Sequence, residues 1–282
     1  MTEVATSDQL LVVIDPVARR TDGESVRIAK DVLSAGAATK VCLPEGPEEF
    51  ARVLARRGSR RPVVVGDDRA LLRAVSLLHR QRELAGCVLS FVPVGGVFSV
   101  ARSLGVPTGA VAAARTVLDG VERRLDLLVD DSDGVVLGAL RIPALPVLPE
   151  GEPVEDSPAH PWLRTCQSLV RTLVPARPPR TAPDPGPRPS RLRVEVDGVL
   201  LVDLDQPVET VSVTPGASGT AAVSVRPLSV GAEASPLEAW GRTVTVSGAD
   251  FRYRADSGVG GPVRRRTWTV WEGALGLTLP GQ

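Results

Sequence analysis

The chain has 282 residues, which is enough for one large domain or two of ordinary size. Hydrophobic residues make up 43% of it and the formal net charge at pH 7 is +0, which excludes disorder by composition and a general attraction to polyanions such as nucleic acids. No apolar run approaches the ~18 residues of a membrane-spanning helix. The N-terminal residues carry no basic segment or cleavage pattern, so we expect a cytoplasmic protein.

The first half of the chain alternates β-branched runs with apolar residues at helical spacing. This alternation predicts an α/β fold with a parallel sheet covered by helices on both faces. Pro16 and the polar residues up to Gly23 are expected to form a turn. The predicted strands are Leu10–Asp15, Thr39–Leu43, Val63–Val65, Cys87–Val92 and Arg124–Val129. The predicted helices begin near Glu24, Pro47, Leu71, Val97 and Thr108 and end near Ser34, Arg57, Arg82, Leu104 and Asp119.

The middle of the chain is rich in proline: 13 of the 25 prolines lie between Pro143 and Pro189. Only Trp162–Val174 keeps the apolar spacing of a helix. The segment Pro175–Arg191 is typical of a stiff linker or a disordered loop. The alternative is a proline-rich ligand for a partner protein.

Beyond the linker the pattern changes to short alternating strands separated by glycine turns, which predicts an antiparallel β-sandwich. The predicted strands are Leu192–Val196, Val199–Leu204, Thr210–Thr214, Thr220–Arg226, Val244–Ser247, Phe251–Ala255, Thr267–Trp271 and Leu275–Leu279. We therefore expect an α/β domain at 1–140, a proline-rich connector with one helix at 141–191, and a β-sandwich domain at 192–282. The aromatic residues of the last part are expected in the sandwich core, with a lipid-contacting surface as the alternative. They are Trp240, Phe251, Tyr253, Trp268 and Trp271.

Two glycine turns follow predicted strands and precede helices. The first is Gly66-Asp67-Asp68-Arg69, and the second contains Gly95-Gly96. Open α/β folds place phosphate sites in such turns, because the helix N-terminus offers free N–H groups and a partial positive charge. Only Lys30 and Lys40 are lysines, so a Walker-type phosphate loop is excluded.

These motifs and their order resemble the diacylglycerol kinase and lipid kinase family, whose nucleotide-binding half is shared with NAD kinases. The first phosphate loop of that family reads GGDGT. Gly66 matches its first glycine and Asp68 its aspartate. Asp67, Arg69 and Ala70 stand where the family has glycine, glycine and threonine.

The second loop of the family reads PxGTxNDFAR, and this chain keeps only part of it. Pro93, Gly95, Ala101 and Arg102 match, whereas Gly96, Val97, Phe98 and Ser99 replace Thr, Gly, Asn and Asp. Asp126 in "RRLDLL" matches an aspartate of the strand that follows. Asp256-Ser257-Gly258 is the best match to the acidic Asp-Gly-Glu motif and lacks its glutamate.

The resemblance implies roles for these residues. Asp256 would accept the proton of the substrate hydroxyl, Asp68 would hold Mg²⁺ through water, and Asp126 would assist the metal. Nucleotide contacts would come from Gly66, Asp67, Arg69, Gly95, Gly96 and Arg102. The structural alternatives are a helix N-cap for Asp68, a strand end for Asp126 and a turn for Asp256.

The replaced residues favour a loss of nucleotide binding. A backbone loop that cradles phosphate needs small residues, whereas Asp67 and Arg69 add side chains and a second carboxylate. We therefore expect a catalytically impaired pseudo-kinase that acts as a ligand-binding or regulatory module. The alternative is an active kinase that uses ATP and Mg²⁺ to phosphorylate a lipid hydroxyl, such as that of diacylglycerol. A third reading is a protein that acts only through interactions of its β half and linker.

The expected ligand is a lipid or another small molecule in the cleft between the two halves. A homodimer is a candidate assembly. If no activity remains, we expect no cofactor.

Overall fold

The computed structural model describes residues 9–144, 190–228 and 235–281. The predicted helix Trp162–Val174 and the linker up to residue 189 lie outside these residues. Strand β8 already begins at Ser190, so the end of the predicted linker is wrong by two residues.

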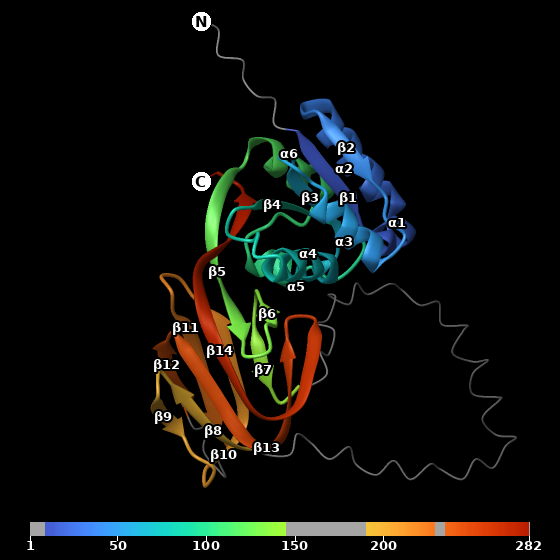
Figure 1. Ribbon diagram of the computed structural model, residues 1–282. Helices are drawn as coiled ribbons and strands as arrows, with labels where there is room; N and C mark the ends of the chain where they lie inside the picture. The colour runs from blue at the N-terminus through green and yellow to red at the C-terminus, as the bar shows by residue number, and fades with distance from the viewer. Residues whose placement is uncertain (1–8, 145–189, 229–234, 282) are drawn as a thin grey trace, which may run out of the picture. The chain divides into compact units, whose positions relative to one another are not determined.

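Four parallel strands form the sheet of the first half, in the order β2-β1-β3-β4 (Figure 1). Each coincides with a predicted strand to within two residues at either end. All their carboxyl ends meet at one edge, as parallel pairing requires. Their bounds are β1 (Leu10–Ile14), β2 (Thr39–Cys42), β3 (Arg61–Gly66) and β4 (Val88–Pro93).

Helices cover both faces of this sheet, as predicted. Leu10, Val12 and Ile14 share a buried cluster with one set of helices, and the alternate residues Leu11 and Val13 share a cluster with the other set. The first set is α1 (Pro16–Thr21), α2 (Gly23–Gly36) and α6 (Ala110–Asp119). The second set is α3 (Pro47–Ala55), α4 (Asp68–Arg80) and α5 (Ser99–Ser103).

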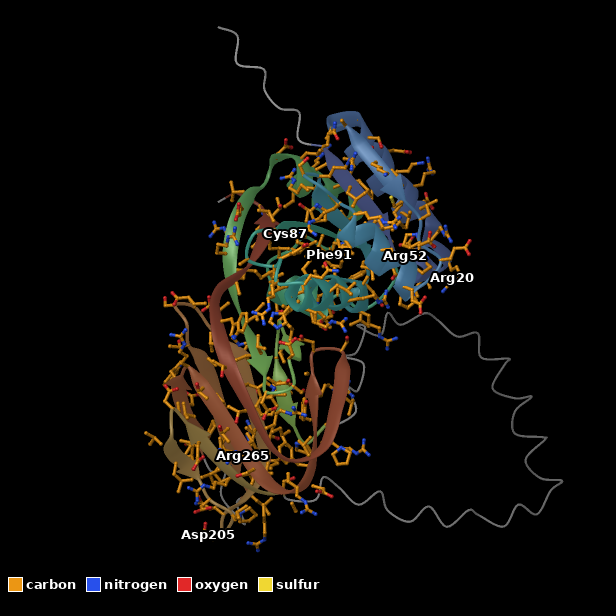
Figure 2. The ribbon with its side chains drawn as sticks, viewed as in Figure 1. Arg20, Arg52, Cys87, Phe91, Asp205 and Arg265 are labelled. Carbon is orange, nitrogen blue, oxygen red and sulfur yellow. The ribbon has the colours of Figure 1, made fainter. Side chains whose placement is uncertain are left out.

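The layer between strands and helices holds the apolar side chains, and the charged ones face outward. Figure 2 shows Cys87 and Phe91 in the interior near β4 and Arg20 and Arg52 at the outer surface. This is the usual separation of apolar and charged groups in a folded domain.

The turn predicted after β1 is wrong, because residues 16–21 form helix α1. The carboxylate of Asp15 accepts a hydrogen bond of 2.8 Å from the N–H of Val17, and Pro16 occupies the first helical turn. An aspartate cap followed by proline is a strong helix start. The helix has only six residues, of which Pro16 and Ala18 are buried, so the sequence carried little apolar periodicity to reveal it.

The second half is antiparallel, as predicted, but several strands are longer than expected. Val244–Ser247 and Phe251–Ala255 are parts of one strand, β13, and Thr267–Trp271 and Leu275–Leu279 are parts of β14. Strands β6, β7 and β12 were not predicted. The bounds are β5 (Val121–Asp130), β6 (Val135–Val136), β7 (Leu140–Ile142), β8 (Ser190–Val196), β9 (Val199–Val202), β10 (Pro207–Pro215), β11 (Ala221–Pro227), β12 (Leu237–Gly241), β13 (Thr243–Ala255) and β14 (Gly258–Leu279).

Strand β14 connects the antiparallel strands to the parallel ones (Figure 1). It pairs antiparallel with β13 and β5, and its last part pairs parallel with β4, where Gly276 lies opposite Val88. The described strands therefore belong to one 14-stranded sheet. The division into domains at residues 140 and 192 stays a prediction.

The aromatic residues of the second half separate into two groups. Phe251, Tyr253 and Trp268 are buried in the core of the antiparallel strands, as predicted. The prediction is wrong for Trp240 and Trp271, which are 65% and 47% exposed. Among the described strands, β12, which carries Trp240, pairs with β11 alone, and Trp271 packs its ring against His79 of α4. Among the described residues, no helix has the length and apolar character needed to cross a membrane.

Candidate functional site

The turn after β3 places Asp67 and Asp68 at the start of α4. Asp67 is the N-cap, and its carboxylate accepts a hydrogen bond of 3.0 Å from the N–H of Ala70. Asp68 is only 1% exposed. Its carboxylate turns away from its own helix to the second loop, and its N–H donates to the carbonyl of Val97 at 3.2 Å. The two candidate phosphate loops are therefore bonded to each other.

The Asp68 carboxylate caps helix α5. It accepts hydrogen bonds from the N–H groups of Val100 at 2.8 Å and Ala101 at 3.0 Å, and from the hydroxyl of Ser99 at 3.1 Å. A carboxylate is stable at a helix N-terminus because the first N–H groups have no partner within the helix. The structural alternative of a helix N-cap for Asp68 was therefore close, but the helix that Asp68 caps is α5, and Asp67 caps α4.

Protein atoms crowd the glycines of both loops. A Cβ at Gly66 would lie 2.6 Å from the Cβ of Ala70, and one at Gly96 would lie 2.8 Å from the Cβ of Asp67. Gly95 has a φ of +81°, and a Cβ there would lie 2.8 Å from the Cα of Ala18 in α1. These glycines are required for contacts between parts of the chain, because any side chain would collide with a neighbouring segment.

Sequence reasoning missed two charged residues at the same edge of the sheet. Asp15, at the end of β1, is buried, and its carboxylate accepts a hydrogen bond of 2.7 Å from Nη1 of Arg73 in α4. Asp15 directly follows a buried strand, which is the signal that could have identified it. By contrast, Arg69 and Arg102 are exposed and, within the described residues, have no side-chain hydrogen bond or ion pair.

Asp256 lies in the turn between β13 and β14 with a φ of +50°. Its carboxylate accepts hydrogen bonds from the N–H groups of Leu137, Gly138 and Ala139 at 2.8, 2.7 and 3.0 Å. Burial raises the pKa of the Asp256 carboxyl, because it disfavours the charged form. The three N–H donors oppose this rise, and the negative charge of Asp68 adds to it.

Both candidate carboxylates are connected to helix α5. Asp68 accepts hydrogen bonds from the first turn of this helix. The segment whose N–H groups bind Asp256 packs against the same helix, since a Cβ at Gly138 would lie 3.2 Å from the hydroxyl of Ser103 and 3.8 Å from Val100. The structure thus brings Asp68 and Asp256 to the same helix. Phe98, which precedes the helix, is half-buried against the core around α4, whereas Val97 is exposed.

Asp126 is bonded elsewhere. Its carboxylate accepts hydrogen bonds from the N–H groups of Gly219 at 2.7 Å and Gly273 at 2.8 Å, so it ties β5 to the loop before β11 and to β14. Among the described residues, Asp126 shares no hydrogen-bond partner with Asp68 or Asp256. In the described ranges, no group of three or more His, Cys, Asp or Glu side chains could hold a metal ion.

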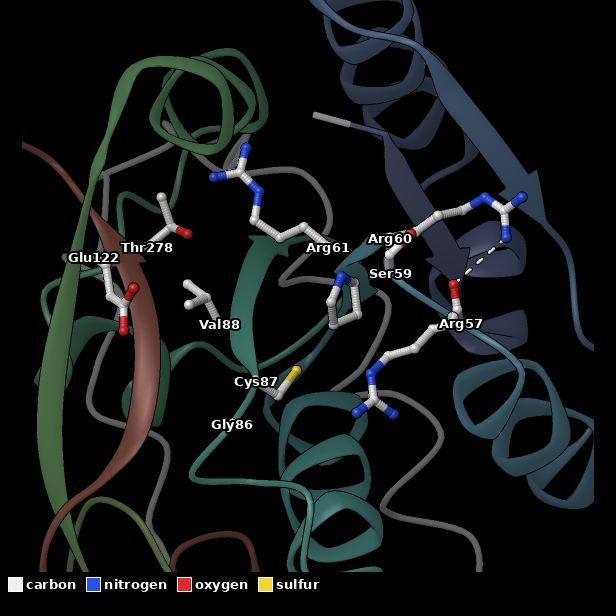
Figure 3. Close-up of a pocket in the computed structure, with 11 residues that line it drawn as sticks. Arg57, Ser59, Arg60, Arg61, Gly86, Cys87, Val88, Glu122 and Thr278 are labelled. Carbon is white, nitrogen blue, oxygen red and sulfur yellow. Dashed lines mark hydrogen bonds between the residues drawn. The ribbon is translucent and has the colours of Figure 1, made fainter. Parts of the chain in front are cut away.

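A pocket of about 410 Å³ lies at the opposite edge, where β3 and β4 begin (Figure 3). Figure 3 shows Arg57 beside Cys87, and Nη1 of Arg60 donates to the Arg57 carbonyl at 3.4 Å. Arg57 also pairs with Glu83. Burial raises the pKa of the Cys87 thiol, although the Arg57 charge lowers it in part. None of the predicted site residues lines this pocket.

No family model and no curated protein matches the chain. Its fold is similar to solved structures from Bacillus anthracis str. Sterne. One, described as "a putative diacylglycerol kinase", is 13% identical, with a TM-score of 0.68 over 99% of this chain and 98% of that one. A second with the same description is 12% identical, with a TM-score of 0.67 over 97% and 98%. A third, a diacylglycerol kinase, is 12% identical, with a TM-score of 0.67 over 97% of each chain. At this identity the likeness concerns the fold, and at that level it confirms the resemblance drawn from the motifs: the chain has a diacylglycerol kinase-like fold.

Proposed function

We propose that this protein is a catalytically impaired relative of the lipid kinases that serves as a ligand-binding or regulatory module. The observation that carries the proposal is the set of hydrogen bonds made by Asp68. In this resting arrangement two backbone N–H groups and a hydroxyl already occupy the carboxylate. Coordination of a metal would compete with these bonds, and hydrogen bonds to a charged group contribute about 1.5–3 kcal/mol each.

The surroundings of the two loops support the same proposal. Asp67 adds a carboxylate where the family has glycine, and Gly96 packs directly against it. Two neighbouring carboxylates repel the phosphates of a nucleotide unless a metal lies between them. Asp126, the second residue expected to assist a metal, is bonded to Gly219 and Gly273 instead.

The proposal keeps the expected layout of an α/β domain followed by a β-sandwich domain, with a lipid or another small molecule as the ligand. It also keeps a cytoplasmic location and the homodimer as a candidate assembly. No nucleic acid is expected, since the chain has no net positive charge.

One observation favours the alternative of an active, ATP- and Mg²⁺-dependent lipid kinase. The pKa of Asp256 is raised by burial and by the negative charge of Asp68. A raised pKa is expected of a base that accepts the proton of a substrate hydroxyl. If ATP and Mg²⁺ bound, Asp68 would be the residue to hold the metal and Asp256 the residue to take the proton.

The experiment that separates these functions uses the purified full chain. Transfer of labelled phosphate from Mg·ATP to diacylglycerol in mixed micelles is measured beside calorimetry with Mg·ATP. We expect no transfer above the rate without protein and no saturable heat. Transfer that disappears in Asp256→Asn, while Arg252→Gln in the preceding strand β13 retains it, would establish the active kinase instead.

A further inference from the structure

The pocket where β3 and β4 begin has a positively charged lining (Figure 3). Its volume of about 410 Å³ is within the usual range for small-molecule sites. Among the described residues, the charged groups of the lining are three arginines, Arg57, Arg60 and Arg61, and one glutamate, Glu122. A concave surface lined by an excess of positive charge attracts anions.

Two positive charges reach the segment that leads into β4. Figure 3 shows Arg57 beside Cys87, and Nη1 of Arg124 donates to the carbonyl of Ala85 at 2.6 Å. Burial raises the pKa of the Cys87 thiol, and the charge of Glu83 adds to this rise. The charges of Arg57 and Arg124 act against it. An anion over this segment would therefore be stabilised from two elements, the loop after α3 and strand β5.

Both arginines have carboxylate partners that a ligand can replace. Arg57 pairs with Glu83, and Arg124 pairs with Glu122 at 2.6 Å. The two glutamate side chains are 45% and 43% exposed, whereas that of Arg57 is only 14% exposed. Exposed ion pairs contribute little to stability, because water solvates each partner well on its own. A stronger anion can thus displace the carboxylates into water while Arg57 stays in place.

The helix ends at this edge do not oppose an anion. The last carbonyls of a helix carry partial negative charge. Arg57 donates to the carbonyl of Leu54 in α3 at 3.4 Å, and Nη2 of Arg61 donates to the carbonyl of Val117 in α6 at 2.8 Å. These arginines neutralise the carbonyls. A guanidinium has five N–H groups in a planar fork, so Arg57 can hold a carbonyl and a phosphate together.

We propose that this pocket binds the phosphate monoester group of a small organic molecule such as a sugar phosphate. The phosphate lies over Gly86 and Cys87, where it replaces the carboxylates of Glu83 and Glu122 as the partner of Arg57 and Arg124. A phosphate monoester has a second pKa near 6 and is mostly a dianion at neutral pH, so it competes well with a single carboxylate. The pocket lies at the edge of the sheet opposite to Asp68 and the two glycine loops, so this inference goes beyond the proposed function and does not depend on it.

The test measures binding of ribose 5-phosphate, ribose and inorganic phosphate to the full chain by calorimetry at pH 7.5, without nucleotide. We expect saturable binding of one ribose 5-phosphate per chain and binding of ribose at least about tenfold weaker, which is the effect of one charge-assisted hydrogen bond. Inorganic phosphate should displace ribose 5-phosphate but bind more weakly. No saturable binding of the ester, or equal binding of ribose, overturns the proposal. Tighter binding of inorganic phosphate than of the ester overturns the assignment of an organic ligand.

A variant that fills the pocket locates the site. A Cβ at Gly86 would meet no described atom within 4 Å, so Gly86→Phe extends into open space of the pocket and should abolish binding of ribose 5-phosphate. Gly109→Phe is the matched control, since this glycine is also exposed, has the same open space at its Cβ and lies outside the pocket. Binding that survives in folded Gly86→Phe contradicts the proposed location.

The exchange of carboxylates predicts variants that bind more tightly. Glu83→Gln and Glu122→Gln each remove a competitor for an arginine and should tighten binding of ribose 5-phosphate by about twofold to fivefold, the effect of one exposed ion pair. Glu24→Gln, an exposed residue of α2, makes the same change in net charge away from the pocket and should leave binding unchanged. Binding that is unchanged or weaker in both pocket variants, or equally tightened in Glu24→Gln, would show that the ligand does not replace these carboxylates.

This proposal and the proposed function fail separately. Phosphate transfer from Mg·ATP to diacylglycerol would remove the proposal of an impaired enzyme and leave the anion pocket untouched. Absence of ribose 5-phosphate binding in a chain that also lacks transfer would remove only the anion pocket.

Discussion

The carboxylate of Asp68 accepts a hydrogen bond of 2.8 Å from the N–H of Val100, although the two residues are 32 positions apart. This contact joins the first turn of α4 to the first turn of α5, and the N–H of Ala101 adds a second bond at 3.0 Å. An aspartate that resembles a metal-binding residue in sequence is thus a helix cap between segments in this structure.

Replacement of Asp68 should therefore destabilise the fold. In Asp68→Ala the buried N–H groups of Val100 and Ala101 lose their acceptor, and each such loss costs about 1–3 kcal/mol. We expect the free energy of unfolding in urea to fall by about 3 kcal/mol. Asp68→Asn should lose less, because its amide oxygen still accepts.

Arg69→Ala, an exposed neighbour, is the control and should change the free energy of unfolding by less than about 0.5 kcal/mol. If Asp68→Ala is as stable as this control, Asp68 does not cap α5.

Arg73 is expected to stabilise the chain through Asp15. The Asp15 carboxylate is buried and receives the Arg73 guanidinium at 2.7 Å, and the Arg73 side chain is 32% exposed. Removal of one partner of a fully buried pair costs about 3–5 kcal/mol, and solvent near Arg73 reduces this to about 2 kcal/mol. A double-mutant cycle with Asp15→Asn and Arg73→Leu measures the coupling. Additive effects of the two substitutions would show that the pair contributes nothing.

Asp256 gives a pH-dependent prediction. Its pKa in the folded chain is above the ordinary value of 3.8, so the folded state binds this proton more tightly than the unfolded state does. The corresponding stability is fully present below pH 3.8 and is lost as the pH rises through the folded-state pKa.

Carbon-13 NMR of the aspartate carboxyls should place the Asp256 midpoint above 3.8, and Asp68→Asn should lower it, because the Asp68 charge contributes to the rise. In urea unfolding, we compare the free energy of unfolding of the unmodified chain with that of Asp256→Asn. The value of the unmodified chain should decrease relative to that of the variant as the pH increases through this window. A midpoint at or below 3.8 contradicts the assignment.

The sequence was sufficient for features that depend on local pattern. Val63–Val65 and the apolar spacing of α4 predicted a buried strand and a helix, because β-branched runs and helical periodicity act over a few residues. Each family motif taken alone is degenerate, but the order of these motifs along nearly the whole chain, beginning with Gly66 and Asp68, was enough to indicate the fold.

Features that depend on distant segments were not predictable from local pattern. The capping of α5 by Asp68 requires two loops to meet. Strand β14 appears in the sequence as two strands, because Glu272-Gly273-Ala274 interrupts the alternation, yet pairing with β5 continues across a register shift between Trp271 and Leu275. A core position was predicted for Trp240 because its side chain is aromatic, but its position on β12 leaves it exposed.

Cys87 provides a prediction about reactivity. Its thiol is buried beside Arg57, and burial raises its pKa above the ordinary value of 9.0, so little reactive thiolate forms at neutral pH. We expect iodoacetamide to modify Cys87 in the folded chain at least about tenfold more slowly than in urea, as measured by mass spectrometry of the peptide that contains it.

Because the Arg57 charge lowers the pKa of Cys87, Arg57→Gln should raise the pH at which modification of the folded chain reaches half its maximum rate. Arg56→Gln, an exposed neighbour, should leave this pH unchanged. A lower midpoint in Arg57→Gln would mean that the guanidinium does not act on the thiol.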